Sequence, residues 1–326
     1  MSKVLTISIA AYNIEDYIRH TVDSLLDERI LGDIEVLICD DGCPDSSLAM
    51  AQEYEKSHPG VVRAIHKENG GYGSVLNTNI GLAKGTYFKQ LDGDDWFDTE
   101  ALVKLVALLK TCEADVVLTP RSDARDGAGP VPEERGWPCD RLLSPQDLED
   151  AFVFGMWHIA VRTELIREHI IQLPEHTLYT DQLYTMCVVA HAQSFWCTNL
   201  PVYCYRIGSE GQSVTRENRI RHLPDMDRVM EEHFSYYEKG DFPEANRGLL
   251  RWRLARYYVL YVKTYLLLPP SADVRKQIKA LDARVKERVP DLYQRAYKDN
   301  WQIRAVRSLD FFGYWLAELK GVNSWA

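Results

Sequence analysis

Residues 86–96 read TYFKQLDGDDW, a largely apolar run that ends in three carboxylates within four positions. The run predicts a buried strand, and Asp92, Asp94 and Asp95 follow where that strand ends. Neighbouring carboxylates raise one another's pKa unless a cation or strong hydrogen-bond donors neutralise them. Two interpretations stay open for this motif. One is a site for Mg²⁺ or Mn²⁺, which prefer oxygen ligands, and the other is an acidic turn that caps the helix expected from Thr99.

Predicted strands and helices alternate along the first part of the chain. Such an alternation, with helices of roughly 10 to 15 residues, predicts an α/β fold with a mostly parallel sheet and helices on both faces. Sheets of this kind bind ligands beyond the carboxyl ends of their strands. Tyr12, Asp40, Asp41 and Asp92 each follow a predicted strand, so we expect them to converge on one edge. Strands are expected at 4–9, 34–39, 61–66, 86–91 and 116–119, and helices from Asn13, Asp45, Ser74 and Thr99.

The pattern becomes less regular after the fifth strand. Residues 121–139 are crowded with Pro, Gly and acidic side chains, which indicates a long surface connection, either a lid over a site or a merely mobile loop. Short helices and aromatic strands are expected from there to Arg206. Beyond Arg219 only helices are indicated. We therefore expect a boundary there, between an α/β region at 1–218 and a helical region at 219–326.

The helical region carries a basic, tyrosine-rich segment. Residues 247–263 contain no acid, and Arg253, Arg256 and Lys263 share one face at helical spacing. A solvated face explains this pattern. The alternative is that this helix, together with the segment FFGYWLAEL at 311–319, contacts a membrane surface or a second subunit in a homo-oligomer.

Length and composition limit the classes of protein. A chain of 326 residues with 46% hydrophobic residues can bury a sizeable core, and a net charge of -10 argues against wholesale attraction to nucleic acid or an anionic bilayer. The seven cysteines are scattered without a CxxC pair, which favours reduced thiols in a cytoplasmic protein. No signal peptide and no run of ~18 uncharged apolar residues is present, so export and membrane insertion are not expected.

Other motifs each allow a structural and a functional interpretation. Asp40 and Asp41 are either a solvated turn or acceptors for a nucleobase N–H or ribose, and Tyr12 could stack on a base beside the small Ala10–Ala11 pair. The glycine-rich stretch 69–74 precedes a helix, where backbone N–H groups favour phosphate, but a tight turn explains it better. Neither GK[ST] nor GxGxxG is present, which disfavours P-loop and dinucleotide-binding proteins.

Asp181 lies at the start of a later predicted helix. It either favours the positive end of that helix or serves as a general base, since a carboxylate that faces a bound donor is what the activation of a hydroxyl requires.

The ordered set of these motifs resembles the family 2 inverting glycosyltransferases of the GT-A fold, over residues 3–215. The resemblance implies that Asp181 is the general base and that Asp94 is the direct ligand of Mn²⁺ or Mg²⁺. Asp92 would serve the ribose, diphosphate and metal. Ala10, Ala11 and Tyr12 would flank the base, and Asp40 would meet the uracil edge. The motifs are SIAAYN, VLICDDG, NGGYGSVLNTNIGLAKGTYF, LDGDDW, YTDQL and YCYRIGSEGQS.

Two positions depart from the family pattern. Thr180 stands where an acid usually precedes the base, and Thr78 stands where many members carry Arg. A cationic contact to the diphosphate is therefore expected from Lys67 and Arg206, and residues 206–213 resemble the stretch that closes over the donor. His158 either faces the acceptor or is a satisfied structural histidine.

We thus expect a metal-dependent, Rossmann-like glycosyltransferase that moves a sugar from a UDP-sugar to a glycan or lipid-linked glycan, in cell-envelope or exopolysaccharide biosynthesis. Its expected place is the cytoplasm, at the inner face of the membrane. One rival is a sugar-phosphate nucleotidyltransferase, whose GxGxR motif is missing here. The other is an inactive nucleotide-sugar-binding protein, against which the intact Asp94 and Asp181 argue.

Overall fold

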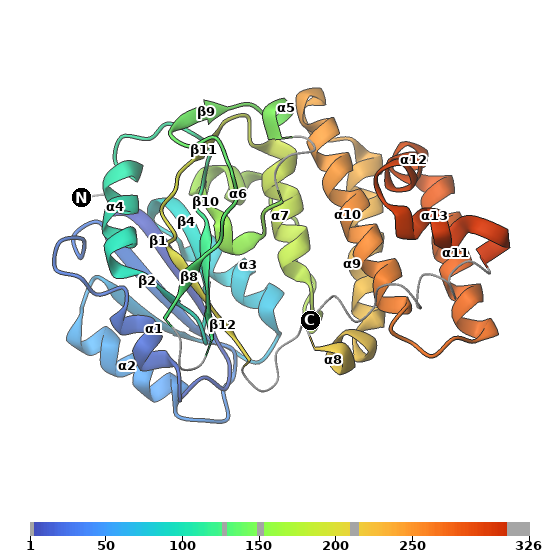
Figure 1. The fold of residues 1–326 in the computed structure, drawn as a ribbon. Helices are drawn as coiled ribbons and strands as arrows, with labels where there is room; N and C mark the ends of the chain where they lie inside the picture. The colour runs from blue at the N-terminus through green and yellow to red at the C-terminus, as the bar shows by residue number, and fades with distance from the viewer. Residues whose placement is uncertain (1–2, 126–128, 149–152, 209–214, 312–326) are drawn as a thin grey trace. The chain divides into compact units, whose positions relative to one another are not determined.

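The computed structural model describes residues 3–125, 129–148, 153–208 and 215–311. The chain divides into two compact units, residues 1–210 and 211–326. The first unit is built on an eight-stranded sheet whose helices lie on both faces (Figure 1). The described residues of the second unit form helices only. The expected α/β fold with a helical C-terminal region is therefore confirmed.

The large sheet is mostly parallel, and β10 and β9 are its antiparallel strands. Dense β-branched and apolar residues explain why its central strands form and why both of their faces are covered. In sheet order the strands are β3 (Val62–His66), β2 (Ile34–Asp40), β1 (Lys3–Ala11), β4 (Gly85–Asp92), β10 (Ile159–Arg162), β6 (Val116–Leu118), β11 (Phe195–Cys197) and β9 (Arg141–Leu143).

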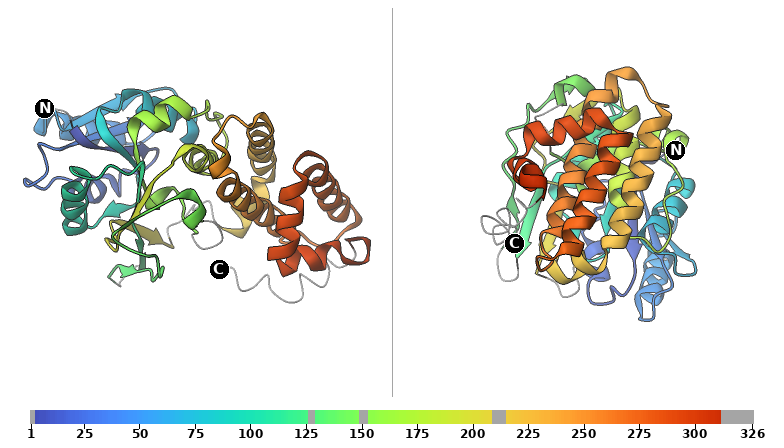
Figure 2. Two further views of the ribbon diagram at one scale, coloured as in Figure 1. Left: turned by 90° about the horizontal axis from the view of Figure 1, so that it is seen from above. Right: turned by 90° about the vertical axis from the view of Figure 1, so that its right-hand side faces the viewer.

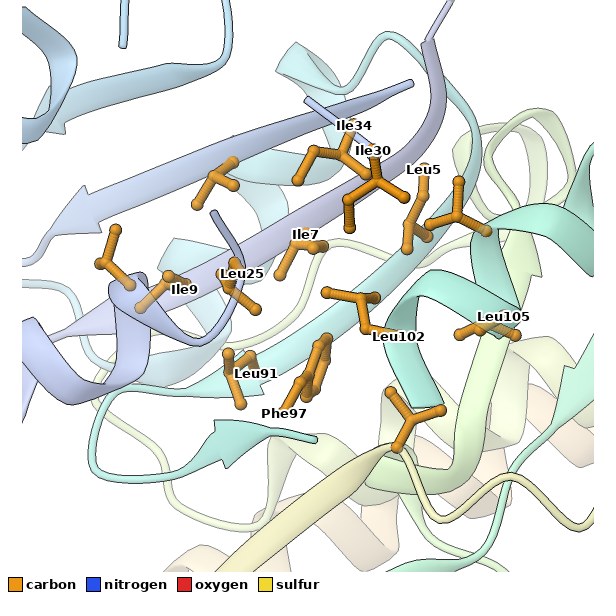
Figure 3. Packing of buried hydrophobic residues seen from close by; sticks show 14 of the residues in the cluster. Leu5, Ile7, Ile9, Leu25, Ile30, Ile34, Leu91, Phe97, Leu102 and Leu105 are labelled. Atoms are coloured by element: carbon orange, nitrogen blue, oxygen red, sulfur yellow. The ribbon is translucent and has the colours of Figure 1, made fainter. Parts of the chain in front are cut away.

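Alternate side chains of β1 fix the two helical layers. Leu5, Ile7 and Ile9 are fully buried in the main core (Figure 3), whereas Ser8 points to the other face and accepts a hydrogen bond from Asn79 Nδ2 at 2.8 Å. Each buried Leu or Ile contributes about 1.5–3 kcal/mol. The core face is covered by α1 (Ile18–Asp23), α2 (Ser47–Ser57) and α4 (Thr99–Leu109), and the other face by α3 (Tyr72–Leu82), α6 (Thr163–His169) and α7 (Thr180–His191).

A second sheet corrects the expectation for residues 121–139. Its order is β5-β12-β7-β8, and β7 pairs in parallel with β12. Residues 121–125 and 131–132 are therefore strands of a sheet, and alternate residues of β7, Ser122 and Ala124, are buried. The strands are β5 (Trp96–Phe97), β12 (Tyr203–Ile207), β7 (Arg121–Arg125) and β8 (Val131–Pro132).

The first helix is shorter than expected. Asn13 does not cap it, since its φ is 55°, and α1 begins only at Ile18. The backbone N–H groups of Ile14 and Glu15 instead donate to Ser47 Oγ and Asp45 Oδ2 at 3.1 and 3.0 Å. Side chains at the start of α2 therefore satisfy donors that a longer helix would have left unpaired.

The second unit consists of helices packed against one another (Figure 2). No helix of the described residues is long and apolar enough to cross a membrane. The helices are α8 (Arg216–Arg221), α9 (Leu223–Lys239), α10 (Arg247–Tyr265), α11 (Ala272–Arg288), α12 (Pro290–Asp299) and α13 (Trp301–Arg307).

The tyrosines of α10 belong to the interior of this unit. The hydroxyls of Tyr258 and Tyr261 donate to Asp282 and Asp227 at 2.5 and 3.0 Å. Of the three basic residues expected on one solvated face, only Arg256 is exposed, since Arg253 and Lys263 are half-buried. Tyr257, Tyr258 and Tyr261 of α10 are buried and not available to a membrane. The segment 311–319 lies, after its first residue, outside the described residues.

Gly93 follows β4 and packs tightly against the end of β1. A Cβ at Gly93 would lie 2.5 Å from the Ala10 carbonyl oxygen and 2.6 Å from Ile14 Cδ1. Gly93→Ala should therefore lower stability by about 1–3 kcal/mol, the cost of overpacking, measured as the urea midpoint. Gly81→Ala is the matched control. Nothing lies within 4 Å of its added Cβ, so it should be neutral or stabilising by up to about 1 kcal/mol. Equal midpoints for the two variants would contradict this packing.

Candidate functional site

The carboxyl ends of the central strands meet at one edge of the sheet. In the register of the sheet, Ala10 lies opposite Asp92 and Ala11 lies opposite Asp40. The expected convergence of these residues is confirmed. Tyr12 comes next in the chain, and its side chain is 54% exposed. An aromatic ring is thus accessible at the edge where the acids gather.

Asp92 is held by a tyrosine from α3. The hydroxyl of Tyr72 donates to Asp92 Oδ1 at 2.5 Å, and the Asp92 backbone N–H donates to the hydroxyl of Tyr203 at 3.3 Å. Burial and then the charges of Asp94 and Asp181 raise the pKa of Asp92 to about 6, against the lowering effect of Tyr72 and Tyr203. This carboxyl is therefore poised to gain from a cation placed beside it.

Asp94 lies beside the cation Arg206. The guanidinium of Arg206 donates through Nε to the Asp94 carbonyl oxygen at 2.9 Å, and it lies over the rings of Tyr17 and Trp96 at 5.0 and 4.9 Å. Burial raises the pKa of Asp94, while its own backbone N–H and Arg206 oppose that shift. Arg206 thus holds a positive charge at the acidic loop.

Asp95 has a structural task that its sequence position did not reveal. It is 1% exposed, and its two carboxylate oxygens accept from the Tyr203 hydroxyl at 2.6 Å and from the Arg206 backbone N–H at 2.7 Å. The Thr21 hydroxyl donates to its carbonyl oxygen. Asp95 therefore fastens the acidic loop to β12 and α1, and in doing so it sets the place of Arg206.

The pair Asp40–Asp41 is buried rather than solvated. Asp40 accepts from the Cys43 backbone N–H at 3.1 Å and forms a 2.6 Å hydrogen bond with His66 Nδ1. Asp41 organises the glycine-rich loop, since it accepts from the backbone N–H groups of Gly70 and Gly71 at 2.9 and 2.8 Å. The solvated-turn interpretation is therefore wrong.

Lys67 is occupied by partners of its own chain. Its ammonium donates to Asp41 Oδ1 at 2.7 Å, to Ser74 Oγ at 2.8 Å and to the Glu68 carbonyl oxygen at 2.5 Å. An ammonium has three donors, so a phosphate would have to displace one of these acceptors.

Asp181 approaches the acids from a second element, at the start of α7. The loop before α7 rests on the glycine-rich loop, because the His176 backbone N–H donates to the Gly70 carbonyl oxygen at 2.7 Å. Gln182 Nε2 donates to Asp181 Oδ2 at 2.7 Å. The charge of Asp181 helps to raise the pKa of Asp92 and of Tyr72, in which burial is the largest cause. The structure therefore brings Asp181 within electrostatic range of the acidic loop.

Thr180 is buried and its Oγ1 has no hydrogen-bond partner within the described residues. Its methyl group lies against Gly73, where an added Cβ would be 3.2 Å away. Thr180 thus packs behind the site, which agrees with its lack of a charge.

His158 is a satisfied structural histidine. It is fully buried, its Nδ1 accepts from the Gly155 backbone N–H at 2.8 Å, and its Nε2 lies 2.6 Å from Glu133 Oε1. Nε2 therefore carries the proton and donates to Glu133. Burial lowers the pKa of His158 to about 4, although Glu133 opposes this shift. The alternative of a contact with the acceptor is not supported.

Lys89 is a buried cation on β4 that no motif indicated. It is 0% exposed, and its ammonium donates to the Trp157 carbonyl oxygen at 2.8 Å and to Thr119 Oγ1 at 3.3 Å. Burial lowers the pKa of Lys89 to about 7. Lys89 holds the segment before β10 in place next to the acidic edge.

The acids fit a divalent metal that is shared with a ligand. Within the part of the chain that the structure describes, no three His, Cys, Asp or Glu side chains form a complete metal-binding group. Mg²⁺ and Mn²⁺ do not need one, because they bind one or two carboxylates together with water and substrate phosphates. Asp92 and Asp94 are half-buried, the charge of Asp94 acts on Asp92, and the pKa values of both are raised. A bound cation would lower both pKa values.

The chain is similar in sequence to known glycosyltransferases. The chain is 25% identical over 300 residues to the uncharacterized glycosyltransferase EpsJ of Bacillus subtilis, which covers 86% of this chain and 84% of EpsJ. It is 34% identical over 263 residues to chondroitin synthase of Pasteurella multocida, which covers 78% of this chain but only 24% of that protein.

Among solved structures, that of S. aureus TarS 1-349 in complex with UDP-GlcNAc matches with a TM-score of 0.72 and 19% identity, over 97% of this chain and 90% of TarS 1-349. This likeness shows the fold. The model of glycosyl transferase family 2 matches residues 6–168, which is half of the chain and includes the whole acidic loop. The chain belongs to glycosyl transferase family 2, and it is a glycosyltransferase of the GT-A fold.

Proposed function

We propose that this enzyme transfers a sugar from a UDP-sugar to a hydroxyl of a glycan or lipid-linked glycan, with inversion and with a divalent metal. The observation that carries the proposal is the set of three acids, Asp92, Asp94 and Asp181, that reach one edge of the sheet from β4 and α7. After burial, the charges of Asp94 and Asp181 raise the pKa of Asp92, and a positive charge beside these acids would favour their ionised forms.

The donor has a complementary surface at this edge. The exposed ring of Tyr12 can stack on a base. Asp40 is buried and bonded to the Cys43 backbone N–H and to His66, so it would meet a nucleobase N–H only if the surrounding loop or His66 moved. Arg206 supplies the cation for the diphosphate, and Lys67 can join it only by giving up one of its three acceptors. The TarS structure with UDP-GlcNAc supports the choice of UDP through the shared fold.

Mn²⁺ or Mg²⁺ would be held by Asp94 and Asp92. When bound, the ion offsets the negative charge that develops on the leaving diphosphate. Arg206 adds a fixed positive charge beside it, and the cation–π contacts with Tyr17 and Trp96 keep that charge in position.

Asp181 acts as the general base. Its carboxylate accepts the proton of the acceptor hydroxyl, whose oxygen attacks the anomeric carbon opposite the nucleotide. The new glycosidic bond forms as the bond to the diphosphate breaks, so the configuration inverts. Gln182 orients Asp181 through its 2.7 Å hydrogen bond. A positioned base contributes about 10²- to 10⁴-fold to the rate.

The biological setting follows from the relatives. Chondroitin synthase makes a polysaccharide by its name, and EpsJ is named a glycosyltransferase. These relatives support a role in polysaccharide biosynthesis of the cell envelope or exterior. We propose the cytoplasmic face of the membrane as the place of the reaction. The match to family 2 supports glycosyl transfer over the rival nucleotidyl transfer.

The roles of Asp94 and Asp181 can be distinguished by measuring nucleotide release from a panel of UDP- and GDP-sugars in the presence of Mn²⁺ and acceptor. Asp181→Asn should lower kcat by about 10²- to 10⁴-fold with little change in donor binding. Asp94→Asn should weaken the response to Mn²⁺, and a chelator should abolish activity. Asp241→Asn, an exposed position in the second unit, is the control and should match the parent.

Unchanged turnover in both site variants would overturn the site. If a chelator left the activity of the parent unchanged, the proposed metal dependence would be wrong but the other site assignments would stand. UDP binding without any release of UDP from a UDP-sugar would identify an inactive binding protein.

The pKa of Asp92 predicts how Mn²⁺ binding depends on pH. Protonated Asp92 cannot hold a cation, so Mn²⁺ affinity should fall as the pH drops below about 6. The Tyr72 hydroxyl stabilises the ionised form, so Tyr72→Phe should raise the pKa of Asp92 by about one unit and move this fall to higher pH. Calorimetric titration with Mn²⁺ measures both. Tyr54→Phe, which removes a similar 2.5 Å hydrogen bond to Asp23 outside the site, should leave the profile unchanged.

A further inference from the structure

The two units carry opposite net charge. Residues 1–210 contain 17 Lys and Arg against 33 Asp and Glu, a net charge of -16, whereas residues 211–326 contain 21 against 15, a net charge of +6. The overall charge of -10 therefore hides a basic unit. Such an asymmetry indicates an anionic partner for the basic part. The acids of the first unit, in contrast, repel any such partner.

The positive charge of the second unit gathers with aromatic rings on α11, α12 and α13. Tyr297 and Trp301 are 49% and 45% exposed, and the exposed Lys298 lies between them in sequence. The guanidinium of Arg304 donates to the Tyr297 and Lys298 carbonyl oxygens at 3.1 and 2.7 Å. We call this group the basic-aromatic surface, and its members are Lys286, Tyr293, Tyr297, Lys298, Trp301 and Arg304.

Tyr293 connects the lysine of α11 to the rest of the surface. Lys286 Nζ lies 5.9 Å from the Tyr293 ring centroid, and the buried Arg307 lies over the rings of Tyr293 and Tyr297 at 3.5 and 5.8 Å. These contacts place both rings beside cations. The surface is therefore continuous across the three helices, which lie side by side (Figure 2).

Nearby acids do not cancel this charge. Asp282 is 4% exposed and bonded to Arg307 at 2.6 Å, and Asp299 is bonded to Arg295. Glu287, next to Lys286, is the exposed carboxylate that remains close in sequence. Lys286, Lys298 and Arg304 thus outnumber the acids that could neutralise them.

We propose that the basic-aromatic surface binds the headgroup region of an anionic membrane. Tyr and Trp side chains favour the membrane–water interface, where an apolar ring and a polar edge are both accommodated. Each Lys or Arg near an anionic leaflet adds attraction. Exposed rings flanked by cations suit the membrane–water interface. A polyanion without apolar groups would use the cations but gain little from the exposed rings. The proposal does not depend on the proposed glycosyl transfer.

The test is flotation of the full chain with vesicles of phosphatidylcholine, with or without about one-third phosphatidylglycerol. The protein should float with the anionic vesicles at low salt and bind weakly at high salt or to phosphatidylcholine alone. Lys286→Gln/Lys298→Gln should lower the partition coefficient about 30-fold, at about fivefold per charge. Trp301→Ala should lower it as well.

Lys56→Gln/Lys104→Gln is the matched control. It removes the same charge from two exposed positions of the first unit, and it should float like the parent. Circular dichroism confirms that each variant is folded.

Three outcomes would overturn the proposal. The first is equal flotation of the two double variants. The second is an unaffected Trp301→Ala variant together with tight, salt-sensitive binding to heparin, which would make the surface a polyanion site. The third is a parent that is an oligomer by light scattering and a monomer as Trp301→Ala, without vesicle binding, which would make the surface an interface between copies of the chain.

Discussion

Repulsion between carboxylates is the constraint on which the first unit depends. Asp94, Asp95 and Asp181 lie within electrostatic range of Asp92 at one edge of the sheet, and the pKa values of Asp92, Asp94 and Asp95 are raised. Such a cluster folds because donors are built around it. Tyrosine hydroxyls, backbone N–H groups and one guanidinium each stabilise a particular acid. The pKa values of Asp92 and Asp94 stay raised despite these donors, so a cation beside the two carboxyls would stabilise their ionised forms.

The acids of the loop divide their tasks by burial. Asp95 is buried and fully bonded to β12, so its charge serves the structure. Asp92 and Asp94 are half-buried, so their oxygens can reach a ligand. The neighbouring carboxylates of Asp94 and Asp95 thus lie in different surroundings, one half-buried and the other buried and bonded to β12.

The sequence predicts the parts of the site that arise from local pattern. Periodicity placed the strands, and the rule that ligands bind at the carboxyl ends of parallel strands placed Asp40, Asp92 and Tyr12 on one edge. Contacts between distant segments were not predictable. Tyr72, Tyr203 and Lys89 looked like ordinary residues of a helix or strand, and their roles follow only from pairing across 20 to 111 positions of sequence. The short strands β7 and β8 were missed because Pro and Gly usually mark loops.

Burial of Lys89 makes its contribution to the stability of the fold depend on pH. A lysine that gives up its proton near pH 7 when folded, but near 10.4 when unfolded, makes the native state hold fewer protons than the denatured state between those values. The contribution of Lys89 to the free energy of unfolding therefore increases as the pH rises across that interval. Below about pH 7 this contribution no longer changes, because the lysine is protonated in both states. For this one group, a mildly alkaline pH favours the folded state.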